Sequence, residues 1–223
     1  FDYHPFRFID FKEQAAIRKQ AVQRSAHRFP TCRRCFYMDF GFLRASSTDL
    51  SRPHKANDRV VYSYDGYTSY LLIVDEASRY VWVFLTHNKS PPLNIVDEFL
   101  KTHGLPDGGF VRTDQGGEFA GSQSLLDTCG SNHYISEPTG ADTPSQNGAI
   151  EIYSDKFGSR VRSLLYGSCL PAKYWSDALR HCVYLHNRLV HTTTKRTPFE
   201  CYYGHKPDLS CLKVFGSRVC VKR

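Results

Sequence analysis

The chain has 223 residues, 41% of them hydrophobic and 14% aromatic, which is enough for one large domain and a small appendage. It has no apolar run long enough to cross a bilayer, so no membrane-spanning helix is expected. The net charge of +7 divides into +5 over residues 1–35 (8 basic, 3 acidic), −6 over 36–150 (8 basic, 14 acidic) and +8 over 151–223 (13 basic, 5 acidic). Basic flanks of this size favour a polyanionic partner.

The first predicted element is a helix over residues 11–28, rich in Ala, Gln, Lys and Arg. Few large apolar residues are present to dock it, so we expect the segment 1–35 to be loosely attached. Two interpretations stay open: an arm that touches nucleic acid, or the leftover of a neighbouring domain. Of the eight cysteines only Cys32 and Cys35 are closely spaced, and the scattered remainder predicts reduced, intracellular thiols.

Three strands follow, over residues 36–43, 69–75 and 80–85, with a polar loop over 44–57 between the first two. Residues 76–79 predict a hairpin turn, so the three strands are expected to be antiparallel. Residues 60–64 are expected to form a short strand as well. The first strand carries Asp39 among aromatic residues, where a buried charge is costly unless a metal or a cation meets it.

The second half of the chain alternates helices and strands. A helix over 91–103 precedes a strand that ends at Asp114, which predicts a crossover onto the hairpin sheet. The remaining expected elements are a short helix (122–129), a fifth strand that ends before Pro138 (133–136), a loop (139–146), a long helix carrying Glu151, a helix (171–189), a short helix (197–204), and a strand pair or the opening of a following module (212–221).

Glu151 lies on the outward face of the long helix. At about 100° per residue, Asp155 and Arg162 fall within about 40° of it. The apolar side chains cluster on the opposite side, at Tyr153, Phe157, Val161 and Leu164. A solvated surface glutamate is one reading of this position. The other reading is a ligand, because Asp39, Asp114 and Glu151 together supply the hard oxygen atoms that Mg²⁺ prefers.

Asp75 and Glu76 rival Asp39 as ligands, because they also stand at a strand end. Their position before Ser78-Arg79 favours a carboxylate that stabilises the hairpin turn. We therefore place Asp39 ahead of them.

Several motifs in order make the chain resemble the integrase catalytic core of copia-type retrotransposons. They are Met38-Asp39, Arg112-Thr113-Asp114-Gln115-Gly116-Gly117-Glu118, Pro144-Ser145-Gln146-Asn147-Gly148 through Glu151, Leu170-Pro171 with Trp175, and Asn187-Arg188. The resemblance implies an α/β, ribonuclease-H-like fold: a mixed five-stranded sheet, three strands antiparallel and then two parallel, flanked by helices. It also implies a D,D,E triad of Asp39, Asp114 and Glu151.

The activity that the resemblance implies is trimming of DNA 3′ ends and their joining to target DNA, with two Mg²⁺ or Mn²⁺ ions bound by the triad. Element ends and target DNA are then the partners, a homo-oligomer is the family expectation, and the expected location is nuclear. Lys156 and Arg162 would contact phosphate, and Gln146 and Asn147 would reach bases or sugar. A solvated surface side chain is the alternative for each of these four.

Three positions depart from the family pattern: Ile152 replaces an Arg, Ser154 replaces an Asn, and Asp155 adds a negative charge one turn from Glu151. They favour an alternative in which the chain is an inactive integrase remnant that acts at most as a DNA-binding module. A metal-dependent nuclease or hydrolase with the same fold is a weaker third reading.

Relatives of this type carry a His, His, Cys, Cys zinc finger before the core, and Cys32 with Cys35 matches its second half. The upstream histidines, His4 and His27, are too far apart to complete a four-ligand site. We therefore expect no tightly held zinc. The predicted organisation is an N-terminal helical segment over 1–35, for which a remnant of the zinc-finger region is one interpretation, an integrase catalytic core over 36–204, and a C-terminal extension over 205–223 that starts a following module.

Overall fold

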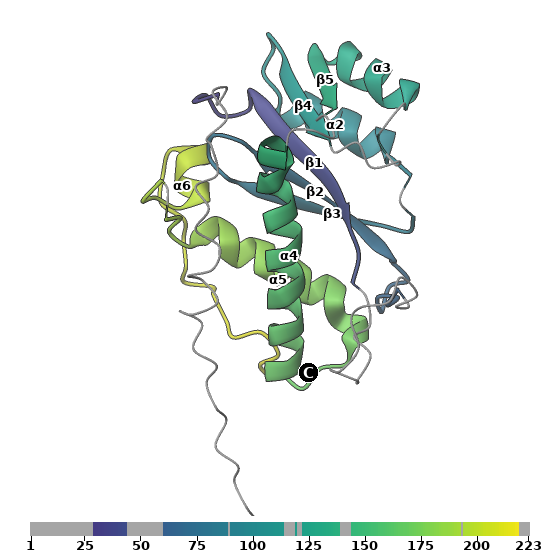
Figure 1. Cartoon of the computed structure of the whole chain (residues 1–223). Helices are drawn as coiled ribbons and strands as arrows, with labels where there is room; N and C mark the ends of the chain where they lie inside the picture. Colours follow the sequence, from purple (N-terminus) through teal and green to yellow (C-terminus); the bar gives the residue numbers. More distant parts are fainter. Residues whose placement is uncertain are drawn as a thin grey trace, which may run out of the picture.

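The computed structural model describes residues 29–43, 60–88, 90–113, 119, 122–138, 144–192 and 194–218, and of residues 138 and 144–152 it describes only the backbone. The elements, in chain order, are β1 (Cys35–Gly41), β2 (Ser69–Asp75), β3 (Val81–Thr86), α2 (Leu93–His103), β4 (Gly109–Thr113), α3 (Gln123–Ser131), β5 (Tyr134–Pro138), α4 (Pro144–Gly167), η1 (Ala172–Tyr174), α5 (Trp175–Arg188) and α6 (Pro198–Tyr203). Figure 1 shows the sheet between α2 and α3 on one side and α4 and α5 on the other.

The five strands form one mixed sheet in the order β3-β2-β1-β4-β5. β1 and β3 pair antiparallel with β2, whereas β4 is parallel to both β1 and β5. The two parallel connections run through α2 and α3, as crossover connections between parallel strands require. The predicted fold, with three antiparallel strands followed by two parallel ones, is confirmed.

Side-chain alternation along β1 divides the core in two. Phe36, Met38 and Phe40 belong to the cluster with α2 and α3, and are at most 8% exposed. Tyr37 and Leu43 belong to the cluster with α4 and α5. A strand turns successive side chains to opposite faces, so Asp39 shares the α4 face with Tyr37.

α4 buries the face that the sequence predicted. Tyr153, Phe157 and Val161 are 6%, 0% and 2% exposed, while Leu165 replaces Leu164 as the fourth fully buried member. Asp155 and Arg162 are exposed, as predicted. The helix lies across the sheet face and packs on α5 and β1.

α5 is fixed to the sheet by polar contacts as well as by its apolar face. Its first residue, Trp175, is 1% exposed and belongs to the core. Near its end, the Asn187 amide donates to the Val81 carbonyl oxygen at 2.8 Å and accepts from the Val81 N–H at 2.9 Å. Asn187 thus pairs with β3 as a neighbouring strand would.

Several predicted boundaries are wrong. The helix expected over 171–189 begins as the 3₁₀ turn η1, because Pro171 precedes it in extended backbone. Residues 60–64 contain a single bridge at Val60 and then a turn. β5 includes Pro138 and α4 begins at Pro144, within the predicted loop. Residues 205–218 form turns without a strand; the predicted helix over 11–28 and the loop over 44–57 lie outside the described residues.

The expectation of loose attachment fails for the described part of the N-terminal segment, residues 29–35. The Phe29 ring stacks on Phe110 at 4.8 Å, and the Arg33 backbone N–H donates to Asp75 at 2.5 Å. The Arg34 guanidinium pairs with Asp107 at 2.7 Å. A hydrogen bond, an ion pair and a ring contact attach this segment, and the small number of large apolar residues in the sequence did not indicate them.

Within the part of the chain that the structure describes, no helix is long and apolar enough to cross a membrane.

Candidate active site

Asp39 stands near the carboxyl end of the central strand, half-buried on the face that α4 covers. Its nearest described partner on α4 is Ser154, whose hydroxyl donates to Asp39 Oδ2 at 2.9 Å. The hydrogen bond links β1 to α4 across 115 residues of sequence. It orients the carboxylate, because a hydroxyl donor fixes one of its two oxygen atoms.

Tyr70 closes the site on the β2 side. It pairs with Gly41 in the sheet register, and its ring lies so close that a Cβ at Gly41 would approach it to 2.2 Å. A side chain at position 41 would therefore require the Tyr70 ring to move. Burial raises the pKa of the Tyr70 phenol, and the Asp39 charge raises it further, so Tyr70 stays a neutral wall beside the carboxylate.

The other two predicted triad members, Asp114 and Glu151, are close in sequence to residues that pair with or contact the Asp39 segment. β1 and β4 pair in parallel up to Met38 with Thr113, and Asp39 and Asp114 are the next residue of each segment. Asp114 lies outside the described residues. Glu151 belongs to α4, three residues before Ser154, so its backbone is one helical turn from the residue that contacts Asp39; its side chain lies outside what is described.

The predicted DNA-contacting residues all belong to α4. The Lys156 and Arg162 side chains are exposed. Partial desolvation of the Lys156 ammonium, together with the Arg160 charge, lowers the pKa of Lys156. Gln146 and Asn147 belong to the first turn of the helix rather than to a loop tip; their side chains lie outside the described part. Among described residues, no three His, Cys, Asp or Glu side chains gather as a metal site.

Asp75 and Glu76, the rival acids, are buried, and their carboxylates accept hydrogen bonds from within the chain. Asp75 is fully buried and accepts from the Ser78 hydroxyl at 2.5 Å and the Ser78 N–H at 2.8 Å. This arrangement confirms the predicted turn-stabilising role. Glu76, 4% exposed, accepts from the Phe29 N–H at 3.2 Å and the Tyr37 hydroxyl at 2.9 Å.

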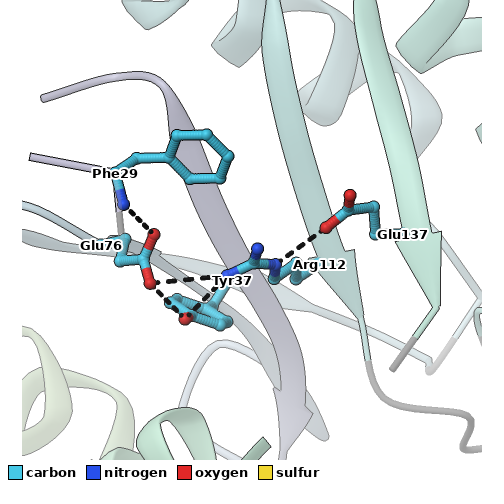
Figure 2. A network of polar contacts seen from close by, with 5 residues as sticks. All are labelled: Phe29, Tyr37, Glu76, Arg112 and Glu137. Carbon is cyan, nitrogen blue, oxygen red and sulfur yellow. Dashed lines mark hydrogen bonds and ion pairs between the residues drawn. The ribbon is translucent and has the colours of Figure 1, made fainter. Parts of the chain in front are cut away.

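Figure 2 shows the cluster around Glu76, here named the acid network: Phe29, Tyr37, Glu76, Arg112 and Glu137. Register places Tyr37, Arg112 and Glu137 in one row across β1, β4 and β5. Arg112, 7% exposed, meets Glu76 at 3.4 Å and Glu137 at 2.9 Å. Burial and the Glu76 charge raise the pKa of Tyr37 to about 12.

Sequence reasoning missed the role of Arg112 and Glu137. The available signal was an arginine enclosed by Val111 and Thr113 in a strand, because a buried guanidinium needs acid partners.

Cys32 and Cys35, the weak zinc candidates, have different surroundings. Cys32 donates its thiol hydrogen toward the Cys201 carbonyl oxygen at 3.5 Å, and burial and Asp75 raise its pKa to about 11. Cys35 is 1% exposed in β1, and burial raises its thiol pKa strongly. His4 and His27 lie outside the described residues.

Known proteins with similar sequences are polyproteins of plant transposons. The chain is 31% identical over 163 residues to the retrovirus-related Pol polyprotein from transposon RE2 of Arabidopsis thaliana, covering 70% of this chain and 11% of the relative. It is 29% identical over 206 residues to that from transposon TNT 1-94 of Nicotiana tabacum, covering 84% and 15%. The chain therefore spans between a tenth and a sixth of these relatives' length. No protein-family model matches it.

Solved structures with a similar fold are viral integrases. The HTLV-2 integrase catalytic core domain, in complex with magnesium in a trimeric form, has a TM-score of 0.50 at 18% identity and covers 76% of this chain and 96% of its own. The simian T-cell lymphotropic virus intasome, in complex with PP2A regulatory subunit B56 gamma, has a TM-score of 0.59 at 14% identity and covers 88% and 62%. The chain is thus related to the Pol polyproteins of copia-type transposons and has the ribonuclease-H-like fold of a retroviral integrase catalytic core.

Proposed function

We propose that this chain is the catalytic core of a retrotransposon integrase that trims DNA 3′ ends and joins them to target DNA. The observation that carries the proposal is the Ser154–Asp39 hydrogen bond. It brings the helix of Glu151 against the strand of Asp39, beside the parallel pairing that leads to Asp114. Relatives within Pol polyproteins support the same reading.

Asp39, Asp114 and Glu151 would hold the divalent metal. The half-buried carboxylate of Asp39 suits Mg²⁺ or Mn²⁺, because it is a hard oxygen donor that is not enclosed by the core. When bound, a pair of such ions lowers the pKa of an attacking water or 3′-hydroxyl and stabilises the leaving oxygen. Magnesium in the HTLV-2 neighbour supports this choice.

The chain's own side chains would position the substrate. Ser154 orients the Asp39 carboxylate, and the buried Tyr70 ring lies on the same face of the sheet. Lys156 and Arg162, both exposed on α4, would bind DNA phosphates. Gln146 and Asn147, at the start of the same helix, would contact sugar or bases. Contacts of the phosphate kind position DNA without reading its sequence.

Strand transfer with pre-trimmed donor DNA tests this function. We expect joined products in Mg²⁺ or Mn²⁺, and none from Asp114→Asn. Asp177→Asn, a change of the same kind at an exposed residue of α5, is the matched control. Joining by Asp114→Asn at the parental rate would refute the assignment of Asp114.

Metal binding has a readout of its own. Ligands that bind only the folded state raise its melting temperature by mass action. Mg²⁺ or Mn²⁺ should therefore raise the melting temperature of the parent and of Asp177→Asn, but much less that of Asp114→Asn. An equal shift in all three proteins would show that Asp114 is not a ligand.

The inactive-remnant alternative is favoured by one observation, the exposed Asp155 one turn from Glu151, where it repels phosphate. If the parent binds metal and DNA but joins no ends, this alternative holds, and the chain is a DNA-binding module.

A further inference from the structure

Exposed tyrosines gather at the turn that precedes β2. Tyr62 and Tyr64 are 67% and 65% exposed. The Tyr64 ring stacks on Tyr174 of η1, with ring centres 5.8 Å apart and planes inclined by 10°. The Lys173 ammonium lies 5.3 Å from the Tyr64 ring centre and 5.5 Å from that of Tyr174. We name Tyr62, Tyr64, Lys173 and Tyr174 the tyrosine platform.

The turn that carries the platform is held firmly. Its ends meet through the Ser63 N–H, which donates to the Tyr67 carbonyl oxygen at 2.8 Å, and the Ser63 hydroxyl, which accepts from the Tyr67 N–H at 2.8 Å. Gly66, at φ 83°, supplies the left-handed residue of the turn. The exposed rings therefore need little ordering before they meet a ligand, which lowers the entropic cost of binding.

Two further bonds tie the turn to the helical layer. The Tyr64 N–H donates to the Lys173 carbonyl oxygen at 2.7 Å. The buried Trp175 donates its indole N–H to the Val61 carbonyl oxygen at 2.9 Å. The platform is thus a composite of two chain segments.

The platform lies at the end of the sheet where β1 finishes. Beyond Asp39, β1 ends at Gly41, and two residues later the Leu43 carbonyl oxygen accepts from the Val61 N–H at 3.0 Å. Tyr70, which lines the Asp39 site, lies 6.0 Å from Trp175 by ring centres. A continuous series of contacts therefore leads from Asp39 to the turn.

We propose that the tyrosine platform holds unpaired bases of the DNA that reacts at Asp39. The inference rests on the proposed function and adds a contact surface to it. Exposed aromatic rings stack with bases of any sequence, and a neighbouring cation meets the phosphate. Lys173 supplies that cation, in a C-terminal part of the chain whose formal charge is +8 (13 basic and 5 acidic residues over 151–223).

A protein partner fits the surface less well. Lysine is depleted from the cores of protein–protein interfaces, yet the Lys173 ammonium lies beside two of the platform rings. Asp65, exposed in the same turn, is the one acid among residues 60–68. A single carboxylate leaves the neighbourhood open to a polyanion.

The test is binding of a fluorescent oligothymidylate, measured by anisotropy over a salt series. Tyr64→Ala and Tyr62→Ala should each weaken binding about tenfold, the effect of one lost base stack. Tyr64→Phe should keep the parental affinity, because stacking does not need the hydroxyl. Lys173→Ala should also reduce the slope of log affinity against log salt by about one phosphate contact.

Tyr203→Ala and Lys206→Ala are matched controls, because both residues are exposed near α6, at the opposite end of α5. They should bind as the parent does, and melting temperatures should show that every variant is folded. If the platform variants bind with parental affinity, the proposed base-binding role of the tyrosine platform is refuted, and the surface is then assigned to a protein contact. The proposed function would still stand. A parent that binds no DNA at all overturns both.

Discussion

At its amino end β1 lies beside Asp75 and Glu76, which are 0% and 4% exposed and are surrounded by N–H, hydroxyl and guanidinium donors. Toward its carboxyl end the same strand carries Asp39, half-buried, whose Oδ2 accepts from the Ser154 hydroxyl of α4. Acids at the first end contribute to folding, because their charges are compensated within the chain. In the proposed function, the acid at the second end binds an external ligand. The surroundings of a carboxylate, more than its place at a strand end, separate the two roles.

The largest loss of stability is expected when the cation beside the acids at the amino end of β1 is removed. Arg112→Met leaves Glu76 buried without its cation, and removing one partner of a buried ion pair costs about 3–5 kcal/mol. Urea unfolding monitored by fluorescence measures the loss. The control is Arg34→Met, whose pair with Asp107 is solvent-exposed and contributes little to stability. Equal losses in the two variants would contradict the contrast between buried and exposed pairs.

His186 contacts both the Asp75 turn, at the amino end of β1, and α4, which covers Asp39. The pH dependence of its charge gives a second test of the comparison between the two ends. Its Nε2 donates to the Arg79 carbonyl oxygen at 3.1 Å, next to the Asp75 turn, and its ring meets Tyr153 and Phe157 of α4 edge-on. Burial lowers its pKa from 6.5 to about 4. The unfolded chain therefore binds a proton between about pH 6.5 and 4 that the folded chain does not.

Unfolding free energy should consequently fall as the pH drops from about 6.5 to about 4, by up to about 3 kcal/mol from this residue. His186→Gln should show a shallower decline over the same range, because glutamine does not titrate. Urea unfolding at several pH values measures the difference. Parallel curves for parent and variant would show that His186 is not the group responsible.

Removing Asp39, the acid near the carboxyl end of β1, should lower strand transfer strongly and change stability little. Asp39→Asn should reduce strand transfer by more than the about hundredfold that loss of an outer-shell partner can cost, because Asp39 is a direct ligand in the proposed site. Stability should change by less than about 0.5 kcal/mol, because Asp39 is half-buried and asparagine still accepts the Ser154 hydrogen bond. Joining assays and urea unfolding on the same preparation separate the two effects. Unfolding of Asp39→Asn at markedly lower urea would place Asp39 with the structural acids.

The smallest effect concerns the residue that orients Asp39. Ser154→Ala removes the hydroxyl and should lower strand transfer about tenfold, as the loss of an outer-shell partner does. Ser159→Ala, an exposed serine on the same helix, should leave it unchanged. Ser154→Asn restores a donor and should recover most of the activity. If all three variants join ends equally well, the hydrogen bond has no part in the reaction.

The strands and the long helix could be predicted because they depend on local sequence pattern. The continuous apolar runs in 69–75 and 80–85 and the buried face of Tyr153, Phe157 and Val161 needed no knowledge of partners. The Asp75 turn was likewise visible from Ser78 nearby. Ser154 was read as a departure from the family pattern, because its value depends on which β1 residue faces α4, a tertiary fact. Arg112 was overlooked for the same reason: Glu76 is 36 residues away along the chain.

Asn187 has a consequence beyond fixing α5. β3 is an edge of the sheet, and a bare edge offers its backbone groups to strands of other molecules. The Asn187 amide occupies both the N–H and the carbonyl of Val81. At the other edge, β5 ends in Pro138, which has no N–H to offer. At each edge of the sheet, one backbone position is thus closed to strands of other molecules.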